Sequence, residues 1–240
     1  MDVSPQYRQA WEGFWSATSD APGEAIWDSD PSLTSVPHSE LLLPYADTSL
    51  PVVDLGCGNG TQTRYLSTVF ARALGVDLSH AAIGHARRAD TAGAAEFAQL
   101  DLADGEGVRT LSRRIGDTNV YMRAVIHQSE PPTRPAVAAA VATLLGERGR
   151  GFVVELTPGS KEVLRSLAEA PGGPPEKLRR VFEHGLKPAD ATEDEVPGLL
   201  RDAGLAVLAS GDTALAQTAH LADGTRVELP ARWFVLAPAS

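Results

Sequence analysis

The sequence is poor in the residues that build disulfides and metal sites. It has one cysteine, Cys57, in 240 residues, which excludes an intramolecular disulfide and a cysteine-rich metal centre. Its histidines at 38, 184 and 220 are scattered, with no ligand spacing such as a pair four residues apart joined by a glutamate. We therefore expect no metal cofactor.

Positive charge is also scarce. The chain has 21 lysines and arginines against 31 aspartates and glutamates, which gives a formal net charge of −10. Its basic residues form no run beyond short pairs such as Arg113-Arg114. Because a nucleic-acid-binding surface normally needs clustered cations, we expect no nucleic-acid partner.

Long apolar runs are missing as well. The longest stretch of small apolar residues, 135–145, is too short to span a bilayer. The N-terminus has neither the basic region nor the apolar core of a secretion signal. We expect a cytoplasmic protein with no membrane contact, and the sequence indicates no oligomeric state.

The sequence does contain the pattern of one α/β domain. Hydrophobic residues make up 43% and charged residues 22%, as in ordinary globular proteins. From residue 50, short apolar runs alternate with helical stretches, which is typical of a parallel sheet. We expect strands at 50–54, 73–77, 96–100, 120–126 and 151–156, and helices at 62–70, 81–89, 135–145 and 193–203. Two long strands, 205–218 and 226–236, should form an antiparallel hairpin through a turn at 222–225.

Two segments interrupt this alternation within the single domain 1–240. Residues 1–45 are rich in aromatics and prolines, and we expect them to cover the domain. Residues 158–191 contain a proline-glycine run at 171–175 and should form part of a lid. The expected cofactor-binding half is 50–157, and 192–240 holds the last helix and the hairpin.

A glycine-rich turn follows the first expected strand. In Asp54-Leu55-Gly56-Cys57-Gly58-Asn59-Gly60 the glycines permit positive φ and close approach of a ligand to the backbone. Asp77 ends the second strand, where a carboxylate can accept hydrogen bonds from a ribose diol, and Asp101 ends the third, where it could meet an adenine amino group. The carboxylate of Asp54 beside the turn is a poor neighbour for a pyrophosphate. It suits a ligand with a sulfonium and an ammonium group, while a nicotinamide- or flavin-dependent oxidoreductase is the alternative.

Residues 51–101 resemble the cofactor-binding motifs of class I S-adenosylmethionine-dependent methyltransferases, chiefly in 52–60 and 75–79. The resemblance implies a Rossmann-like, seven-stranded, mostly parallel sheet with an antiparallel last strand and helices on both faces. It also implies S-adenosyl-L-methionine as cofactor and S-adenosyl-L-homocysteine as product. The residues we expect to bind this cofactor are Asp54, Gly56, Cys57, Gly58, Asn59, Asp77, Leu78, Asp101, Leu102 and Arg123.

The fourth expected strand carries two unusual polar residues. Strand alternation places Arg123 and His127 on one face, and a buried Arg123 should pair with a carboxylate, for which Glu155 on the neighbouring strand is the candidate. His127 would lie at the carboxyl end of the strand, near the methyl group. Imidazole ordinarily changes charge near neutral pH, so His127 is our candidate general base. A histidine that only lines the pocket or caps a helix is the alternative.

The sequence restricts the class of methyl acceptor mainly because one motif is missing after the fourth strand. Families that methylate exocyclic amino groups of bases or glutamine amides carry Asn/Asp-Pro-Pro-Tyr/Phe after the fourth strand, where this chain has residues 127–132, His-Gln-Ser-Glu-Pro-Pro. We therefore expect methylation of an oxygen, nitrogen or sulfur atom of a small molecule or peptide, as in specialised metabolism. Trp15, Trp27 and His127 are the candidate acceptor contacts. The rival hypothesis is a protein that binds the same cofactor without transferring its methyl group.

Overall fold

The computed structural model describes residues 3–169, 173–186, 192–221 and 223–239 of the chain. The expected proline-glycine run, the end of the expected lid segment and the expected turn at 222–225 therefore fall partly outside the described residues. Within those ranges, none of the helices combines the length and apolar character that crossing a bilayer requires.

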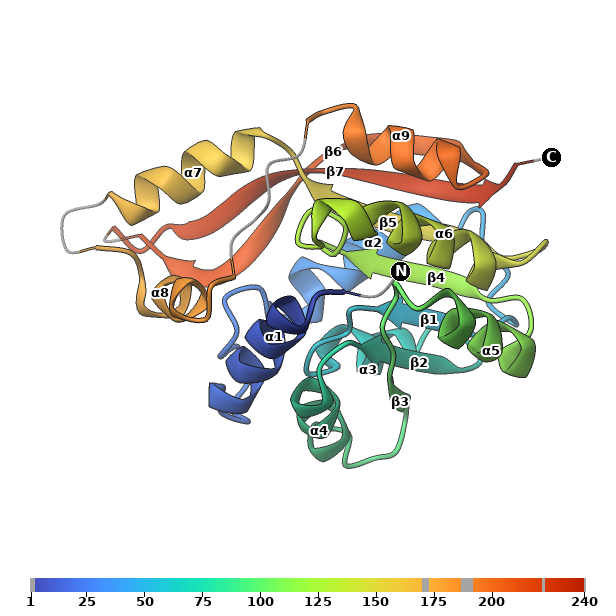
Figure 1. The fold of residues 1–240 in the computed structure, drawn as a ribbon, viewed down its shortest axis with the longest axis horizontal. Coiled ribbons are helices and arrows are strands. Elements are labelled where there is room, and N and C mark those ends of the chain that lie inside the picture. The colour runs from blue at the N-terminus through green and yellow to red at the C-terminus, as the bar shows by residue number, and fades with distance from the viewer. Residues whose placement is uncertain (1–2, 170–172, 187–191, 222, 240) are drawn as a thin grey trace.

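A seven-stranded sheet in the order β3-β2-β1-β4-β5-β7-β6 forms the centre of the fold (Figure 1). Its strands are β1 Val52–Leu55, β2 Ala73–Asp77, β3 Glu96–Gln99, β4 Asn119–Arg123, β5 Gly151–Leu156, β6 Leu205–His220 and β7 Arg226–Pro238. The first five strands pair in parallel, and β7 is antiparallel to both β5 and β6. The expected fold class and terminal hairpin are confirmed.

Helices cover both faces of this sheet. They are α1 Pro5–Ala17, α2 Ser35–Leu42, α3 Thr61–Leu66, α4 His80–Ala89, α5 Gly105–Ile115, α6 Arg134–Leu145, α7 Gly159–Ala168, α8 Glu176–Glu183 and α9 Glu195–Asp202. Apolar side chains of α5, α6 and α9 pack on one face, and those of α2 and α3 pack on the other. Alternation along the strands divides the two cores, since Val53 and Val153 belong to the first and Val52 and Phe152 to the second.

Most expected elements are confirmed, with corrections at four places. Helix α2 within the cover segment and α5 between the third and fourth strands were missed, and the helix expected at 62–70 ends at Leu66. The fourth strand was expected to reach Ile126, yet β4 ends at Arg123 because Ala124 has a φ of +60°. A left-handed residue cannot continue a pleated strand, so the chain turns there and residues 125–128 form a loop at the edge of the sheet.

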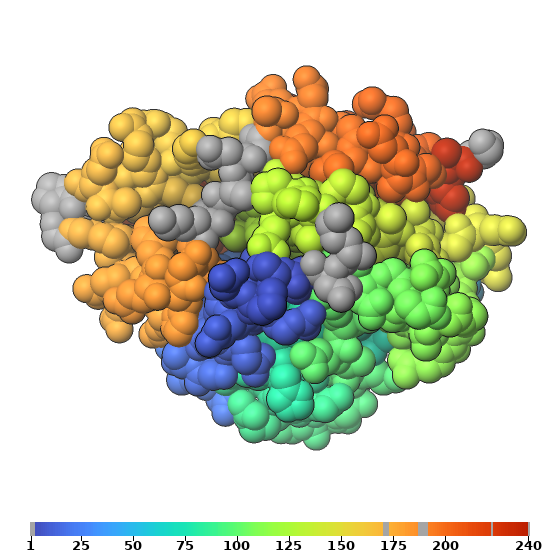
Figure 2. Space-filling model, in the orientation of Figure 1, coloured from blue at the N-terminus to red at the C-terminus, as the bar shows by residue number. Residues whose placement is uncertain are grey.

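The terminal hairpin extends well beyond the sheet. Within β7, the residues that pair with β5 are 231–236. The half of the hairpin nearer its turn therefore runs past the other strands. This half consists of residues 214–220 and 226–230. Figure 1 shows this half bending away between α7 and α8. A further apolar cluster joins it to these two helices and to α1. Figure 2 shows the dark blue surface of α1 lying between α8 and the green side of the domain.

Candidate functional site

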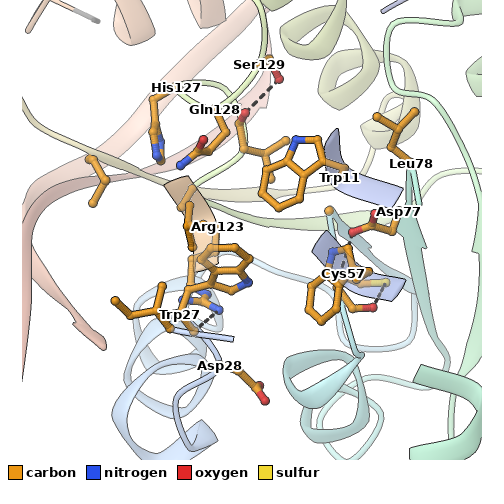
Figure 3. Close-up of a pocket in the computed structure, with 18 of the residues that line it drawn as sticks. Trp11, Trp27, Asp28, Cys57, Asp77, Leu78, Arg123, His127, Gln128 and Ser129 are labelled. Carbon is orange, nitrogen blue, oxygen red and sulfur yellow. Dashed lines mark hydrogen bonds between the residues drawn. The ribbon is translucent and has the colours of Figure 1, made fainter. Parts of the chain in front are cut away.

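A single continuous cavity opens at the carboxyl ends of the parallel strands. Its lining includes the glycine-rich turn, the ends of β1 and β2, and side chains of α1, α8 and the terminal hairpin. In Figure 3, Asp77 and Cys57 line one side, His127 and Gln128 line the other, and Trp27 lies between.

The glycine-rich turn brings bare backbone to this cavity. Gly56 and Gly58 have φ values of +71° and +55°. A Cβ on Gly56 would lie 2.6 Å from Val125, and one on Gly58 would lie 2.8 Å from Trp15. Side chains are therefore excluded at both positions by backbone conformation and by space. Cys57 between them is buried, and burial raises the pKa of its thiol, so it acts as a packed small residue.

Two carboxylates border the turn, the buried Asp54 and the partly buried Asp77. Asp77 at the end of β2 accepts hydrogen bonds from the backbone N–H groups of Gly58 and Ser79, both at 2.9 Å. Asp54 at the end of β1 accepts one from Thr63 at 2.6 Å. Burial raises the pKa of each carboxylate to about 6. Both groups are thus held in an environment that favours a positively charged neighbour.

The remaining predicted cofactor residues extend the same wall. Leu78, Asp101 and Leu102 line the cavity beyond Asp77, and Asp101 forms an ion pair with Arg8 of α1 at 2.7 Å. Asn59 lines it on the other side of the turn and donates to Asp28 at 2.6 Å.

The predicted ion pair between Arg123 and Glu155 is wrong. Nη2 of Arg123 donates to the backbone oxygen of Trp27 at 2.8 Å, and Nη1 is buried without a hydrogen-bond partner. The chain turns at Ala124, so the backbone of the next three residues, and not Arg123, reaches Glu155. Arg123 and Asp54 both line the cavity, and the positive charge of Arg123 partly opposes the rise in the pKa of Asp54 that burial causes.

Glu155 is instead the partner of His127. Its Oε2 lies 2.6 Å from Nδ1 of His127. Its two oxygens also accept hydrogen bonds from the backbone N–H groups of Val125, Ile126 and His127 at 2.8–3.1 Å. A carboxylate that accepts all these bonds fixes the hydrogen of His127 on Nδ1. The opposite nitrogen, Nε2, has no partner, and His127 lines the cavity.

The comparisons with known proteins agree with this geometry. Residues 52–149 match a family model described as a methyltransferase domain. A structure of an S-adenosylmethionine-dependent methyltransferase from Anabaena variabilis is 29% identical over 99% of this chain and 97% of that one, with a TM-score of 0.90. The chain therefore contains an S-adenosylmethionine-dependent methyltransferase domain.

More distant structures share the fold of the methyltransferase. Magnesium protoporphyrin IX methyltransferase from Synechocystis, solved with bound S-adenosylhomocysteine, is 18% identical over 87% of this chain and 82% of that one, with a TM-score of 0.55. A methyltransferase from Clostridium acetobutylicum is 13% identical over 89% and 94% of the two chains, with a TM-score of 0.62. The comparison with curated proteins found no match.

The methyltransferase also has site features that sequence reasoning missed. Glu155 was singled out but assigned to the wrong partner. Arg134 is buried and donates to the backbone oxygens of His127 and Ser129, both at 3.2 Å, which braces the loop that carries His127. An arginine at the start of an alanine-rich helix gave no sign of this role. The two tryptophans predicted to contact the acceptor, Trp15 and Trp27, line the cavity.

Proposed function

We propose that the methyltransferase methylates an oxygen, nitrogen or sulfur atom of a small molecule, with His127 as the general base. The observation that carries this proposal is the unpartnered Nε2 of His127 in the cavity, opposite a ring nitrogen held by Glu155. A buried nitrogen that is a lone-pair acceptor, oriented by a fixed partner, has the arrangement of a base awaiting a proton. A histidine that merely lines the wall needs no such partner.

The cofactor fits the side of the cavity bordered by the glycine turn. In this proposal Asp77 accepts hydrogen bonds from the ribose hydroxyls, and Asp101 and Leu102 flank the adenine. The methionine end carries an ammonium and a carboxylate, and Asp54 and Arg123 are groups of opposite sign near that end. Nη1 of Arg123, which lacks a partner, is the donor we assign to the carboxylate.

The bound cofactor supplies a methyl group already activated by its sulfonium. The protein holds this methyl in line with the acceptor atom, and such alignment by itself accounts for much of the rate enhancement in displacement reactions. Transfer of this methyl to the acceptor atom would break the carbon–sulfur bond and leave its electron pair on sulfur. The proton of the acceptor passes to Nε2 of His127, and Glu155 stabilises the resulting imidazolium.

A two-stage experiment tests the proposal. Calorimetry with S-adenosylhomocysteine, and with NAD as the control ligand, should detect binding of the first only. Incubation of metabolite extracts with the protein and S-adenosylmethionine should then yield a product heavier by one methylene in mass spectra. His127→Ala should retain cofactor binding and reduce formation of that product by about 10²–10⁴-fold. Cofactor binding with no methylated product in any extract would favour the non-methylating rival.

A further inference from the structure

The cavity continues past the cofactor side into a region with apolar walls. This acceptor chamber is lined by side chains of α7, α8, the extended half of the hairpin and the loop after α1. Its principal residues are Ile26, Leu164, Leu178, Val181, Leu215 and Leu229. Apart from Leu164 they are at most 6% exposed, so the chamber is shielded from bulk water.

The chamber is part of the folded core. Strands β6 and β7 run beyond the sheet there, and α8 packs across them, so their side chains belong to one apolar cluster with Phe14 and Trp15 of α1. The walls consequently come from segments far apart in the sequence. The space between them does not depend on a single exposed loop.

Charged side chains of α8 point away from the chamber. Leu178 and Val181 are buried and line it, whereas Lys177 donates to the backbone oxygen of Gly23 at 2.5 Å and Arg180 pairs with Glu24 at 3.4 Å. Both cations are thus used to hold the segment after α1 against the helix. Their charges are compensated outside the chamber.

The described part of the cavity lining offers no spare cation to an acidic acceptor. Among the described lining residues, the carboxylates are those of positions 28, 54, 77 and 101, and the proposed function already assigns Arg123, the one guanidinium in the lining, to the cofactor. The other polar side chains of the lining are His127 and neutral groups: amides such as Gln128 and Gln217, hydroxyls such as Tyr7 and Ser129, and indoles. His127 offers an acceptor atom.

We infer that the methyl acceptor is a neutral molecule with a hydrocarbon body and a hydroxyl or thiol group that meets Nε2 of His127. The inference rests on the proposed function and narrows its acceptor. A carboxylate in the chamber would be desolvated without a cation to pair with, and a peptide would leave buried amide groups unsatisfied. A hydrocarbon body gains free energy from burial against these walls.

Matched probes test this inference with the intact protein saturated with S-adenosylhomocysteine. Calorimetry compares naphthol with naphthoate, and decanol with decanoate, near neutral pH. The alcohol of at least one pair should bind at least about tenfold more tightly than its acid, a difference of about 1.4 kcal/mol. Tighter binding of the acids, or no binding of any probe, would overturn the inference while leaving the methyltransferase assignment intact. Failure of S-adenosylhomocysteine itself to bind would overturn both.

Two valine-to-threonine substitutions test whether the preferred alcohol binds in the acceptor chamber. Val181→Thr places a hydroxyl in the chamber with little change of shape and should weaken binding of the preferred alcohol several-fold. Val207→Thr, at a residue 45% exposed on β6, is the control and should leave it unchanged. Equal effects of the two substitutions would show that the probe binds elsewhere, and the inference would fail.

Discussion

Glu155 Oε2 lies 2.6 Å from Nδ1 of His127, and both side chains are at most 3% exposed. The contact depends on Ala124, whose φ of +60° turns the chain after β4. The next three backbone N–H groups then converge on the carboxylate. A left-handed alanine is destabilising by about 1–2 kcal/mol. The hydrogen bonds to Glu155 offset this strain, and the same bonds orient the imidazole.

Replacement of Glu155 by glutamine should show whether His127 needs the carboxylate itself or only a side chain of this size beside its ring. The amide can donate to Nδ1, which moves the imidazole hydrogen to Nε2 and removes the base. We expect kcat to fall by at least about tenfold with little change in S-adenosylhomocysteine affinity. Because a donor would also face backbone N–H groups, the free energy of unfolding should fall by about 1–3 kcal/mol.

Nitrogen NMR of the His127 ring reports the tautomer directly and should show the hydrogen on Nε2 in Glu155→Gln. Glu162→Gln, on the surface of α7, removes only an exposed pair with Arg165 and serves as the control. A variant with reduced stability, full kcat and an unchanged tautomer would assign Glu155 a purely structural role.

Arg123→Gln should weaken binding of ligands that carry the methionine end of the cofactor. S-Adenosylhomocysteine carries the carboxylate that we assign to Nη1, and methylthioadenosine lacks it. Loss of a charge-assisted hydrogen bond should reduce affinity for the first by about 10–100-fold and leave the second nearly unchanged. Titration calorimetry with both ligands measures this. Equal weakening of the two would contradict the assignment.

Asp77 should make cofactor binding depend on pH. Burial raises its pKa from 3.8 to about 6 in the free protein, and only the ionised carboxylate offers both oxygens to the ribose hydroxyls. Affinity for S-adenosylhomocysteine should therefore fall as pH drops below about 6, by up to about tenfold per unit. Asp77→Asn should bind weakly and show a shallower dependence, because Asp54, whose pKa burial also raises to about 6, still titrates in this range.

The same raised pKa has the opposite effect on stability. The folded state binds the proton of Asp77 more tightly than the unfolded state, so this group's contribution favours folding increasingly as pH falls from about 6 towards 3.8. Thermal unfolding of the free protein and of Asp77→Asn, compared across that range, isolates the contribution. A difference between the two proteins that is independent of pH would contradict the assigned shift.

Gly58→Ala should displace Trp15 and disturb the cofactor side of the cavity. The added Cβ would lie 2.8 Å from the indole at a residue with φ of +55°. Gly93 has a φ of +63° and nothing within 4 Å of its Cβ position, so Gly93→Ala carries the backbone strain without the crowding. Both variants should lose about 1–2 kcal/mol of stability from strain. Only Gly58→Ala should also weaken S-adenosylhomocysteine binding, as measured by calorimetry.

The cofactor side could be predicted because its signals are local. Glycines with positive φ, a strand before them and a helix after them are consecutive in the chain, and Asp77 and Asp101 each end a short apolar run. Parallel strands bring such ends to one edge by geometry alone. The partner of Arg123 could not be predicted, because it depended on one left-handed alanine that no periodicity reveals.

The sequence by itself determined the alternating α/β pattern and the terminal hairpin, because hydrophobic periodicity and turn chemistry act over a few residues. The seven-stranded sheet and the cofactor followed from the resemblance of residues 52–60 and 75–79 to known methyltransferases. Tertiary structure alone decided that Glu155 holds His127 and that Arg123 bonds to the backbone of Trp27. It also decided that α8 and a bent hairpin enclose an apolar chamber. These contacts join residues tens of positions apart, and their identity depends on where the whole chain packs.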